Sequence, residues 1–245
     1  MEIQIDGRCV SYIDQGQGPE ILLLHGWGAP AQTYRLIIDH LSSRCRVVAP
    51  DLPGFGGSQE PSEPWAVDNY VDFTLKFCKA VGLTFPILIG HSYGGRIIIK
   101  LMNRPNLGIT VPKIILMDAA GIKPARGPKY YIKVYSYKAL RRILPPLAEK
   151  MRRKTGSSDY RNASPIMRRS LVLALNEDLT PLLSGISAST LLVWGEKDTA
   201  TPLSDGQKME TLIPGSGLVV LKDAGHFSFA DRWGQCSRVL DSFIG

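Results

Sequence analysis

One short segment combines a nucleophilic side chain with the glycines that would expose it. Residues 90–94 read Gly-His-Ser-Tyr-Gly, directly after the apolar run 85–89 and directly before the helix-compatible stretch 96–102. A Gly-x-Ser-x-Gly pattern between a strand and a helix is typical of a tight turn that lifts the serine hydroxyl clear of the sheet. Glycine suits both ends, because a Cβ there would collide with nearby backbone. The pattern predicts Ser92 as a nucleophile; the alternative is a glycine-rich turn with an incidental serine.

A serine hydroxyl is a weak nucleophile near neutral pH and needs a base within hydrogen-bond reach. His226 follows the apolar run 218–221 and is predicted to lie on a loop at a strand end. His91 adjoins the serine and cannot easily fold back on it, while His25 lies in a different loop and His40 in a predicted helix. We therefore expect His226 to be the base.

The base needs a carboxylate to orient it, and this group is expected after another strand, between serine and histidine in chain order. Asp198 follows the predicted strand 191–194 and meets this requirement. Glu196 is one alternative, and Asp118, which follows the preceding predicted strand, is another. Asp198 could instead cap the helix that begins near Ser204.

Attack on a carbonyl creates an oxyanion that needs two preorganised hydrogen-bond donors. One is the amide after the nucleophile, the N–H of Tyr93. The second is expected on the loop after an earlier strand, here His-Gly-Trp-Gly at 25–28, where the N–H of Trp27 is the candidate. For the His25 side chain a structural role is favoured.

Four separated motifs together resemble the α/β-hydrolase superfamily over nearly the whole chain. This resemblance implies an α/β fold: an eight-stranded, mostly parallel sheet flanked by helices, with a helical cap inserted after strand six. It also implies that Asp51 belongs to a structural turn, and that Ser92 argues against the dehalogenase and epoxide hydrolase branches, which use aspartate. The motifs are His25 to Gly28, Asp51 to Ser58, Gly90 to Gly95, and Gly195 to Asp198 together with Asp223 to His226.

Short β-branched runs alternate with helical periods, as expected for parallel strands joined by helices. A helix is predicted over 67–81, and the first two strands are expected to form a hairpin. Residues 122–181 lack strand signals and form the predicted cap, with helices near 129–143, 147–153 and 164–176; residues 1–121 and 182–245 form the core. The resemblance implies that the cap builds an acyl pocket over the serine. The predicted strands are 2–5, 9–13, 21–24, 46–49, 86–89, 114–117, 191–193 and 218–221.

The cap carries the chain's excess positive charge. Between residues 123 and 169 lie 14 of the 29 Lys and Arg but only two of the 22 acidic residues, which gives +12 there and −5 elsewhere. Such a field steers anionic partners. Recognition of an anionic substrate or an acidic carrier protein, contact with a membrane surface and a merely solvated face all remain open. Nucleic acid is not expected, because no nucleic-acid-binding motif is present.

The His-Gly-Trp-Gly loop, the Asp-Leu-Pro-Gly-Phe-Gly turn and the basic cap are similar to the pimeloyl carrier-protein methyl ester esterases. This similarity implies carrier contacts by Arg141, Arg142, Arg152 and Arg153. The expected activity is carboxylic ester hydrolysis through an acyl-serine, with no metal or organic cofactor. Thioesterase, lactonase, peptidase and carbon–carbon bond hydrolase activities fit the same residues, and a non-catalytic receptor on this fold is the alternative from another class.

The four cysteines show no metal-binding spacing and are expected to be reduced thiols. The N-terminus lacks the basic start and apolar run of a secretory signal, and no stretch approaches 18 apolar residues. A cytoplasmic location is therefore expected.

Overall fold

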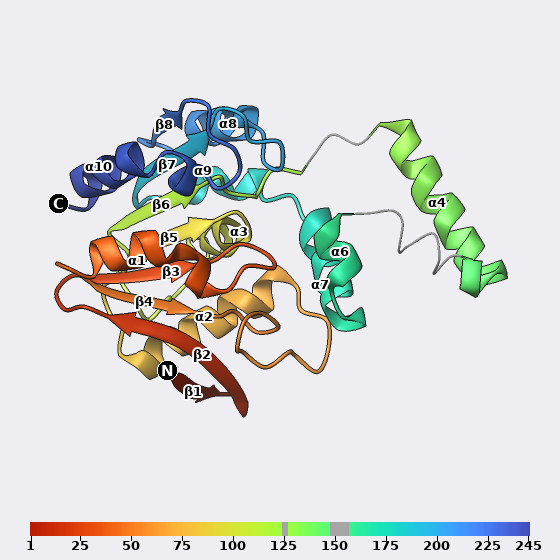
Figure 1. Cartoon of the computed structure of the whole chain (residues 1–245), viewed down its shortest axis with the longest axis horizontal. Coiled ribbons are helices and arrows are strands. Elements are labelled where there is room, and N and C mark those ends of the chain that lie inside the picture. The colour runs from red at the N-terminus through yellow and green to blue at the C-terminus, as the bar shows by residue number, and fades with distance from the viewer. Residues whose placement is uncertain (124–126, 148–156) are drawn as a thin grey trace.

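The computed structural model describes residues 1–123, 127–147 and 157–245, and an eight-stranded sheet forms its centre (Figure 1). The strand order is β1-β2-β4-β3-β5-β6-β7-β8. β2 pairs antiparallel with β1 and with β4, and the other pairs are parallel, so the predicted hairpin and mostly parallel sheet are confirmed. The strands are β1 (Glu2–Ile5), β2 (Arg8–Gln15), β3 (Glu20–Leu24), β4 (Arg46–Pro50), β5 (Ile87–His91), β6 (Lys113–Met117), β7 (Ser189–Gly195) and β8 (Gly217–Leu221).

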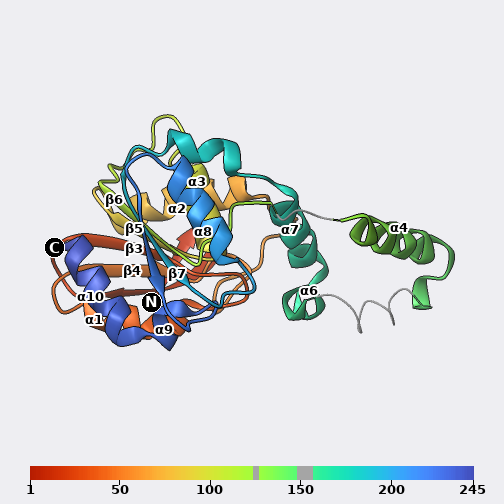
Figure 2. The ribbon, with the colours of Figure 1, turned by 90° about the horizontal axis from the view of Figure 1, so that it is seen from above.

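Helices cover both faces of the sheet, which explains why the central strands read as continuous apolar runs. In β3, for example, Leu22 and Leu24 join one buried cluster, while Ile21 and Leu23 join the other. Two groups of helices provide the opposing surfaces (Figure 2). The first face carries α2 (Val67–Val81), α3 (Tyr93–Leu101) and α8 (Leu203–Leu212), and the second carries α1 (Arg35–Leu41), α9 (Ser228–Asp231) and α10 (Trp233–Ile244).

The chain between β6 and β7 is helical, as the sequence predicts for 129–143 and 164–176. Its described elements are α4 (Pro128–Ile143), α6 (Ser158–Asn162), α7 (Pro165–Asn176) and the 3₁₀ helix η2 (Thr180–Gly185). Most of the predicted helix 147–153 lies outside the described residues. The sequence did not predict α6, because a five-residue helix is too short to show a helical period.

Of these helices, α7 packs on the core. Met167 of α7 is buried, the Ser170 hydroxyl accepts a hydrogen bond from the Trp65 amide at 2.8 Å, and Arg96 of α3 donates to the carbonyl of Ala174. By contrast, α4 lies apart from the sheet in both views (Figures 1 and 2), and its described side chains include none that is buried. The described part of α4 therefore has no buried face that docks on the core, and the acyl pocket that the resemblance implies beneath the cap stays a prediction.

None of the four cysteines is paired in the structure: Cys9 is half-buried, and Cys45, Cys78 and Cys236 are buried. Within the described ranges, no helix has both the length and the apolar composition needed to cross a bilayer.

Candidate active site

Ser92 lies in the turn between β5 and α3, with its backbone at φ 48° and ψ −109°. A positive φ is uncommon for a residue other than glycine and indicates local strain at this turn. The neighbouring glycines make this turn possible. A Cβ on Gly94 would lie 2.1 Å from the carbonyl oxygen of Leu24, and a Cβ on Gly90 would lie 2.9 Å from that of Gly94. The turn therefore holds the serine at the carboxyl ends of the parallel strands.

The structure brings Ser92, His226 and Asp198 together from three loops. The Oγ of Ser92 lies 3.0 Å from Nε2 of His226, and Nδ1 of His226 lies 2.8 Å from Oδ2 of Asp198. A carboxylate beside Nδ1 favours the tautomer that carries its proton there, which leaves Nε2 free to accept from the serine hydroxyl. The His226 side chain is 23% exposed and the Asp198 side chain is fully buried. The carboxylate that contacts His226 is therefore shielded from water.

The carboxylate of Asp198 is held as an anion by its hydrogen bonds. Oδ1 accepts from the amides of Ala200 at 2.7 Å and Thr201 at 3.0 Å, and Oδ2 accepts from the Thr201 hydroxyl at 2.7 Å. Burial raises the pKa of Asp198, but the hydrogen bonds from His226 and Thr201 outweigh it, so the net pKa is below its ordinary value. These partners precede α8, so Asp198 does not cap that helix.

The two predicted oxyanion donors flank the serine. Tyr93 follows Ser92 directly, and the loop that carries Trp27 runs beside it, since a Cβ on Gly26 would lie 3.2 Å from the Cβ of Ser92. The rings of Trp27 and Tyr93 meet edge to face at 5.1 Å. Among the described residues, neither backbone N–H donates to another group, so both are free to donate to an incoming oxygen.

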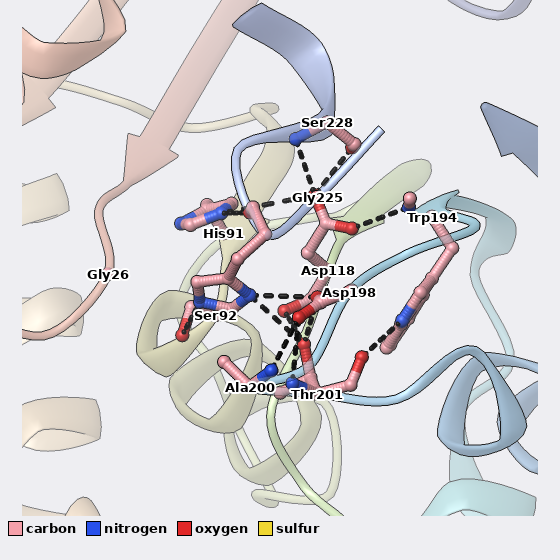
Figure 3. A network of polar contacts seen from close by, with 12 residues as sticks. Gly26, His91, Ser92, Asp118, Trp194, Asp198, Ala200, Thr201, Gly225 and Ser228 are labelled. Atoms are coloured by element: carbon pink, nitrogen blue, oxygen red, sulfur yellow. Dashed lines mark hydrogen bonds and ion pairs between the residues drawn. The ribbon is translucent and has the colours of Figure 1, made fainter. Parts of the chain in front are cut away.

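The alternative acids are engaged elsewhere. Asp118, at the end of β6, accepts the Gly195 amide on Oδ1 at 2.8 Å and the Ser228 amide and hydroxyl on Oδ2 at 3.2 and 2.5 Å. Burial raises its pKa to about 7. Glu196 accepts the Asp223 amide on an exposed loop. Asp118 therefore anchors the segment that follows His226 (Figure 3), and it is Asp198 that contacts the imidazole.

Two further polar residues near the site are structural, as predicted. His25 accepts the Leu52 amide on Nε2 at 2.8 Å and contacts the Gly26 carbonyl through Nδ1 at 2.7 Å. Its burial lowers the pKa to about 4, which keeps the ring neutral. Asp51 accepts the amides of Ala31 at 2.7 Å and Gly57 at 2.9 Å.

Three residues that contact the site were not predicted: Tyr34, His91 in a supporting role, and Thr201. Thr201 had a weak local signal, because a hydroxyl three residues after an aspartate often bonds back to its carboxylate. Tyr34 lies at the end of the 3₁₀ helix η1 (Ala31–Tyr34) and meets His91 across 57 residues of chain. No spacing in the sequence indicates that contact.

Of the four arginines proposed as carrier contacts, Arg142 is exposed on α4. Arg141 belongs to the same helix, but its side chain lies outside the described residues, as do Arg152 and Arg153. Among the residues that the structure describes, no three His, Cys, Asp or Glu side chains are grouped so that they could hold a metal ion.

Comparison with known proteins decides the family. The sequence profile of the Alpha/beta hydrolase family matches residues 21–239. The chain belongs to the alpha/beta hydrolase family. This alpha/beta hydrolase is 28% identical over 256 residues to the pimeloyl-[acyl-carrier protein] methyl ester esterase of Aeromonas hydrophila, covering 94% of this chain and 97% of that one. It is 30% identical to haloalkane dehalogenase 2 of Mycobacterium bovis, covering 89% of this chain and 85% of that one.

The fold of this alpha/beta hydrolase is also that of a solved esterase. The esterase from Exiguobacterium antarcticum superposes with a TM-score of 0.80 over 99% of this chain and 98% of that one, at 24% identity. The TM-score shows that the two proteins share a fold. The predicted α/β-hydrolase architecture is therefore confirmed by family, by topology and by structural likeness.

Proposed function

We propose that this alpha/beta hydrolase is a serine hydrolase that cleaves carboxylic esters through an acyl-serine intermediate. The observation that carries the proposal is the continuous contact from the Ser92 hydroxyl through His226 to Asp198, at 3.0 and 2.8 Å, on a strained turn. A serine hydroxyl beside a histidine that a carboxylate orients is the arrangement that activates serine for attack on carbonyl carbon.

In the first half-reaction, Ser92 Oγ attacks the ester carbonyl carbon while His226 Nε2 takes the hydroxyl proton. The ionised Asp198 stabilises the resulting imidazolium. The carbonyl oxygen becomes an oxyanion that accepts hydrogen bonds from the amides of Trp27 and Tyr93. When the tetrahedral intermediate collapses, the ester C–O bond breaks and the leaving alcohol receives its proton from His226. The acyl group remains on Ser92.

In the second half-reaction, water attacks the acyl-serine carbonyl carbon. His226 removes a proton from this water and later returns it to Ser92 Oγ, so the acid is released and the enzyme is restored. The chemistry draws on the chain's own side chains and backbone amides. The Mycobacterium bovis relative is named a haloalkane dehalogenase. Haloalkane cleavage is a poor candidate for this chain, because the dehalogenase branch uses an aspartate nucleophile and this chain has Ser92 at that position.

For the substrate, we propose an apolar acyl group with an anionic or carrier-linked end. Aromatic rings gather near the serine: Trp27 packs edge to face on Phe55 and Tyr93, and Phe227 is 41% exposed beside His226. The +12 charge of residues 123–169 favours negative partners. The similarity to the Aeromonas hydrophila esterase supports an acidic acyl carrier protein, with residues 122–181 as a cap that meets it.

An active-site probe separates an enzyme from a receptor. We expect a fluorophosphonate to label the wild-type protein, and Ser92→Ala to lose both labelling and ester hydrolysis. Ser216→Ala, which removes a hydroxyl on the loop before β8, is the matched control and should keep both. A folded wild-type protein that the probe does not label would refute the proposal in favour of a ligand receptor. A panel of methyl esters, thioesters, lactones and peptides then ranks the reaction classes.

The carrier proposal has its own test. Arg142→Glu on α4 should lower kcat/KM for a methyl ester attached to an acidic acyl carrier protein, but not for the free methyl ester, because rim charges act mainly on the encounter rate. Arg238→Glu, a charge reversal at another exposed position, on α10, should leave both rates unchanged. If, at low salt, Arg142→Glu has the same kcat/KM as the wild type for the carrier-linked ester, carrier recognition through Arg142 of α4 is excluded.

A further inference from the structure

Three hydrogen bonds link the loop that carries Trp27 to the loop that carries His226. The Gly26 amide donates to the Tyr34 hydroxyl at 2.9 Å, and that hydroxyl lies 2.8 Å from Nδ1 of His91. On the other side of the ring, Nε2 of His91 lies 2.7 Å from the carbonyl oxygen of His226. Because a carbonyl can only accept, Nε2 of His91 carries the proton, Nδ1 is an acceptor, and the Tyr34 hydroxyl donates to it. One tautomer of His91 therefore satisfies all three hydrogen bonds, and we call the pair Tyr34 and His91 with these bonds the relay.

Both ends of this relay reach residues that the proposed reaction uses. Gly26 precedes Trp27, whose amide is a proposed oxyanion donor, and His226 is the proposed base. His91 itself precedes the nucleophile Ser92 (Figure 3). The side chains of Tyr34 and His91 together thus connect three loops: the one with Trp27, the one with Ser92 and the one with His226. The fit at the first end is close, since a Cβ on Gly26 would lie 2.9 Å from Nδ1 of His91.

Ring contacts hold the two relay side chains in place. Tyr34 stacks on Phe229 with ring centres 5.2 Å apart, and His91 stacks on Phe227 at 5.0 Å. Tyr34 is fully buried and His91 is 2% exposed. Burial also lowers the pKa of His91 to about 3, so the ring stays neutral and keeps its acceptor nitrogen. The relay is therefore shielded from water, satisfied in its hydrogen bonds and anchored to the same segment as the base.

We propose that Tyr34 and His91 are positioning residues that hold the oxyanion loop and His226 at a fixed separation around Ser92 throughout the reaction. The inference rests on the proposed function. Its physical basis is that the two amide donors and His226 must be in place at the same time when the tetrahedral intermediate forms. A displacement of about 1 Å costs about 100-fold in rate. Both side chains are buried, so they are placed to act through the loops that they connect.

The first test is Tyr34→Phe, which keeps the ring on Phe229 but removes the hydroxyl from both hydrogen bonds. We expect kcat for ester hydrolysis to fall about 10- to 100-fold, with KM within about twofold. The affinity for phenylboronic acid, which forms a tetrahedral adduct with an active serine, should fall in parallel. Thr190→Val removes another buried hydroxyl, bonded to the Ala188 carbonyl at 2.8 Å, and should change the melting temperature only.

The second test asks whether the two residues act together. His91→Gln keeps an N–H for the His226 carbonyl but offers no acceptor at the position of Nδ1, so the link to Tyr34 is broken. The double variant with Tyr34→Phe should then be less impaired than the product of the two single effects, because coupled residues are not additive. If Tyr34→Phe does not fold, His91→Gln alone tests the positioning role: a lower kcat and a weaker boronate affinity would support it.

Three outcomes separate the positioning role of Tyr34 and His91 from the proposed ester hydrolysis. Slower kcat and weaker boronate binding in folded variants, with a double variant less impaired than the product of the single effects, support the relay. An active wild type with unchanged kcat in both variants, or with single effects that multiply, overturns the relay alone. A wild-type protein with no Ser92-dependent hydrolysis refutes the proposed function and removes the relay with it.

Discussion

The free energy of unfolding should depend on pH through three buried groups: Asp118 should raise it as the pH falls, and His25 and His91 should lower it. Burial raises the pKa of Asp118 to about 7, and lowers the pKa of His25 to about 4 and that of His91 to about 3. Asp118 holds its proton more tightly when folded, so its contribution is present at low pH and lost as pH rises through about 7. The histidines behave in reverse: below about pH 6.5 the unfolded chain binds protons that the folded protein excludes.

The magnitudes follow from these values. Between pH 7 and pH 5, each histidine lowers the free energy of unfolding by about 2 kcal/mol, whereas Asp118 raises it by about 2 kcal/mol. These groups together leave the wild type about 1 to 2 kcal/mol less stable at pH 5. Asp118→Asn removes the only favourable contribution of the three, so the variant should lose about 4 kcal/mol over the same range.

Urea unfolding at the two pH values, followed by circular dichroism, measures the difference. The substitution also places an amide against the Ser228 donors, so the variant starts from a lower stability; the change between pH values is the readout. All other titratable groups are shared and cancel in the comparison. Thr190→Val, which removes no titratable group, should keep the wild-type change. Equal losses in the wild type and in Asp118→Asn would refute the assignment of a raised pKa to Asp118.

Three further results are expected. Met167→Ala should lower the free energy of unfolding by about 2 to 5 kcal/mol, measured by urea denaturation, because this buried side chain fills the contact between α7 and the core. Gly94→Ala should abolish folding or Ser92 labelling, since its Cβ would lie 2.1 Å from backbone oxygen, whereas Gly217→Ala, with open space around it, should retain both. Thr201→Val should lower kcat for ester hydrolysis about 10-fold, because Oδ2 of Asp198 loses a hydrogen bond at 2.7 Å and the carboxylate is held less firmly beside His226; an unchanged kcat in the folded variant would contradict this role.

The elements that carry strong local signals could be predicted from the sequence. Strands with apolar residues on both faces, such as β3 and β6, stand out because burial on two sides leaves no polar alternation. The serine turn is equally visible, because backbone crowding at Gly90 and Gly94 admits no other residue type. Chain order then limits where the base and the acid can be.

The choice between two aspartates shows where sequence reasoning ends. Asp118 and Asp198 follow adjacent parallel strands, so their positions in the chain suit the acid almost equally. Only the folded structure shows that Gly195 and Ser228 occupy both oxygens of Asp118. Contacts of this kind, like that between Tyr34 and His91, join distant segments through single side chains and leave no period or motif in the sequence.

The register of β6 and β7 has an evolutionary consequence. The two strands are parallel neighbours, with Lys113 opposite Ser189 and Met117 opposite Val193, although several helices separate them along the sequence. Of the helices between them, α4 has no buried side chain among its described residues, so it can be lengthened, shortened or exchanged without shifting a strand, whereas α7 is fixed by its contacts with the core. Changes in α4 can therefore alter what the proposed site recognises without moving Ser92, His226 or Asp198, and a protein engineer can insert a different segment at the same place.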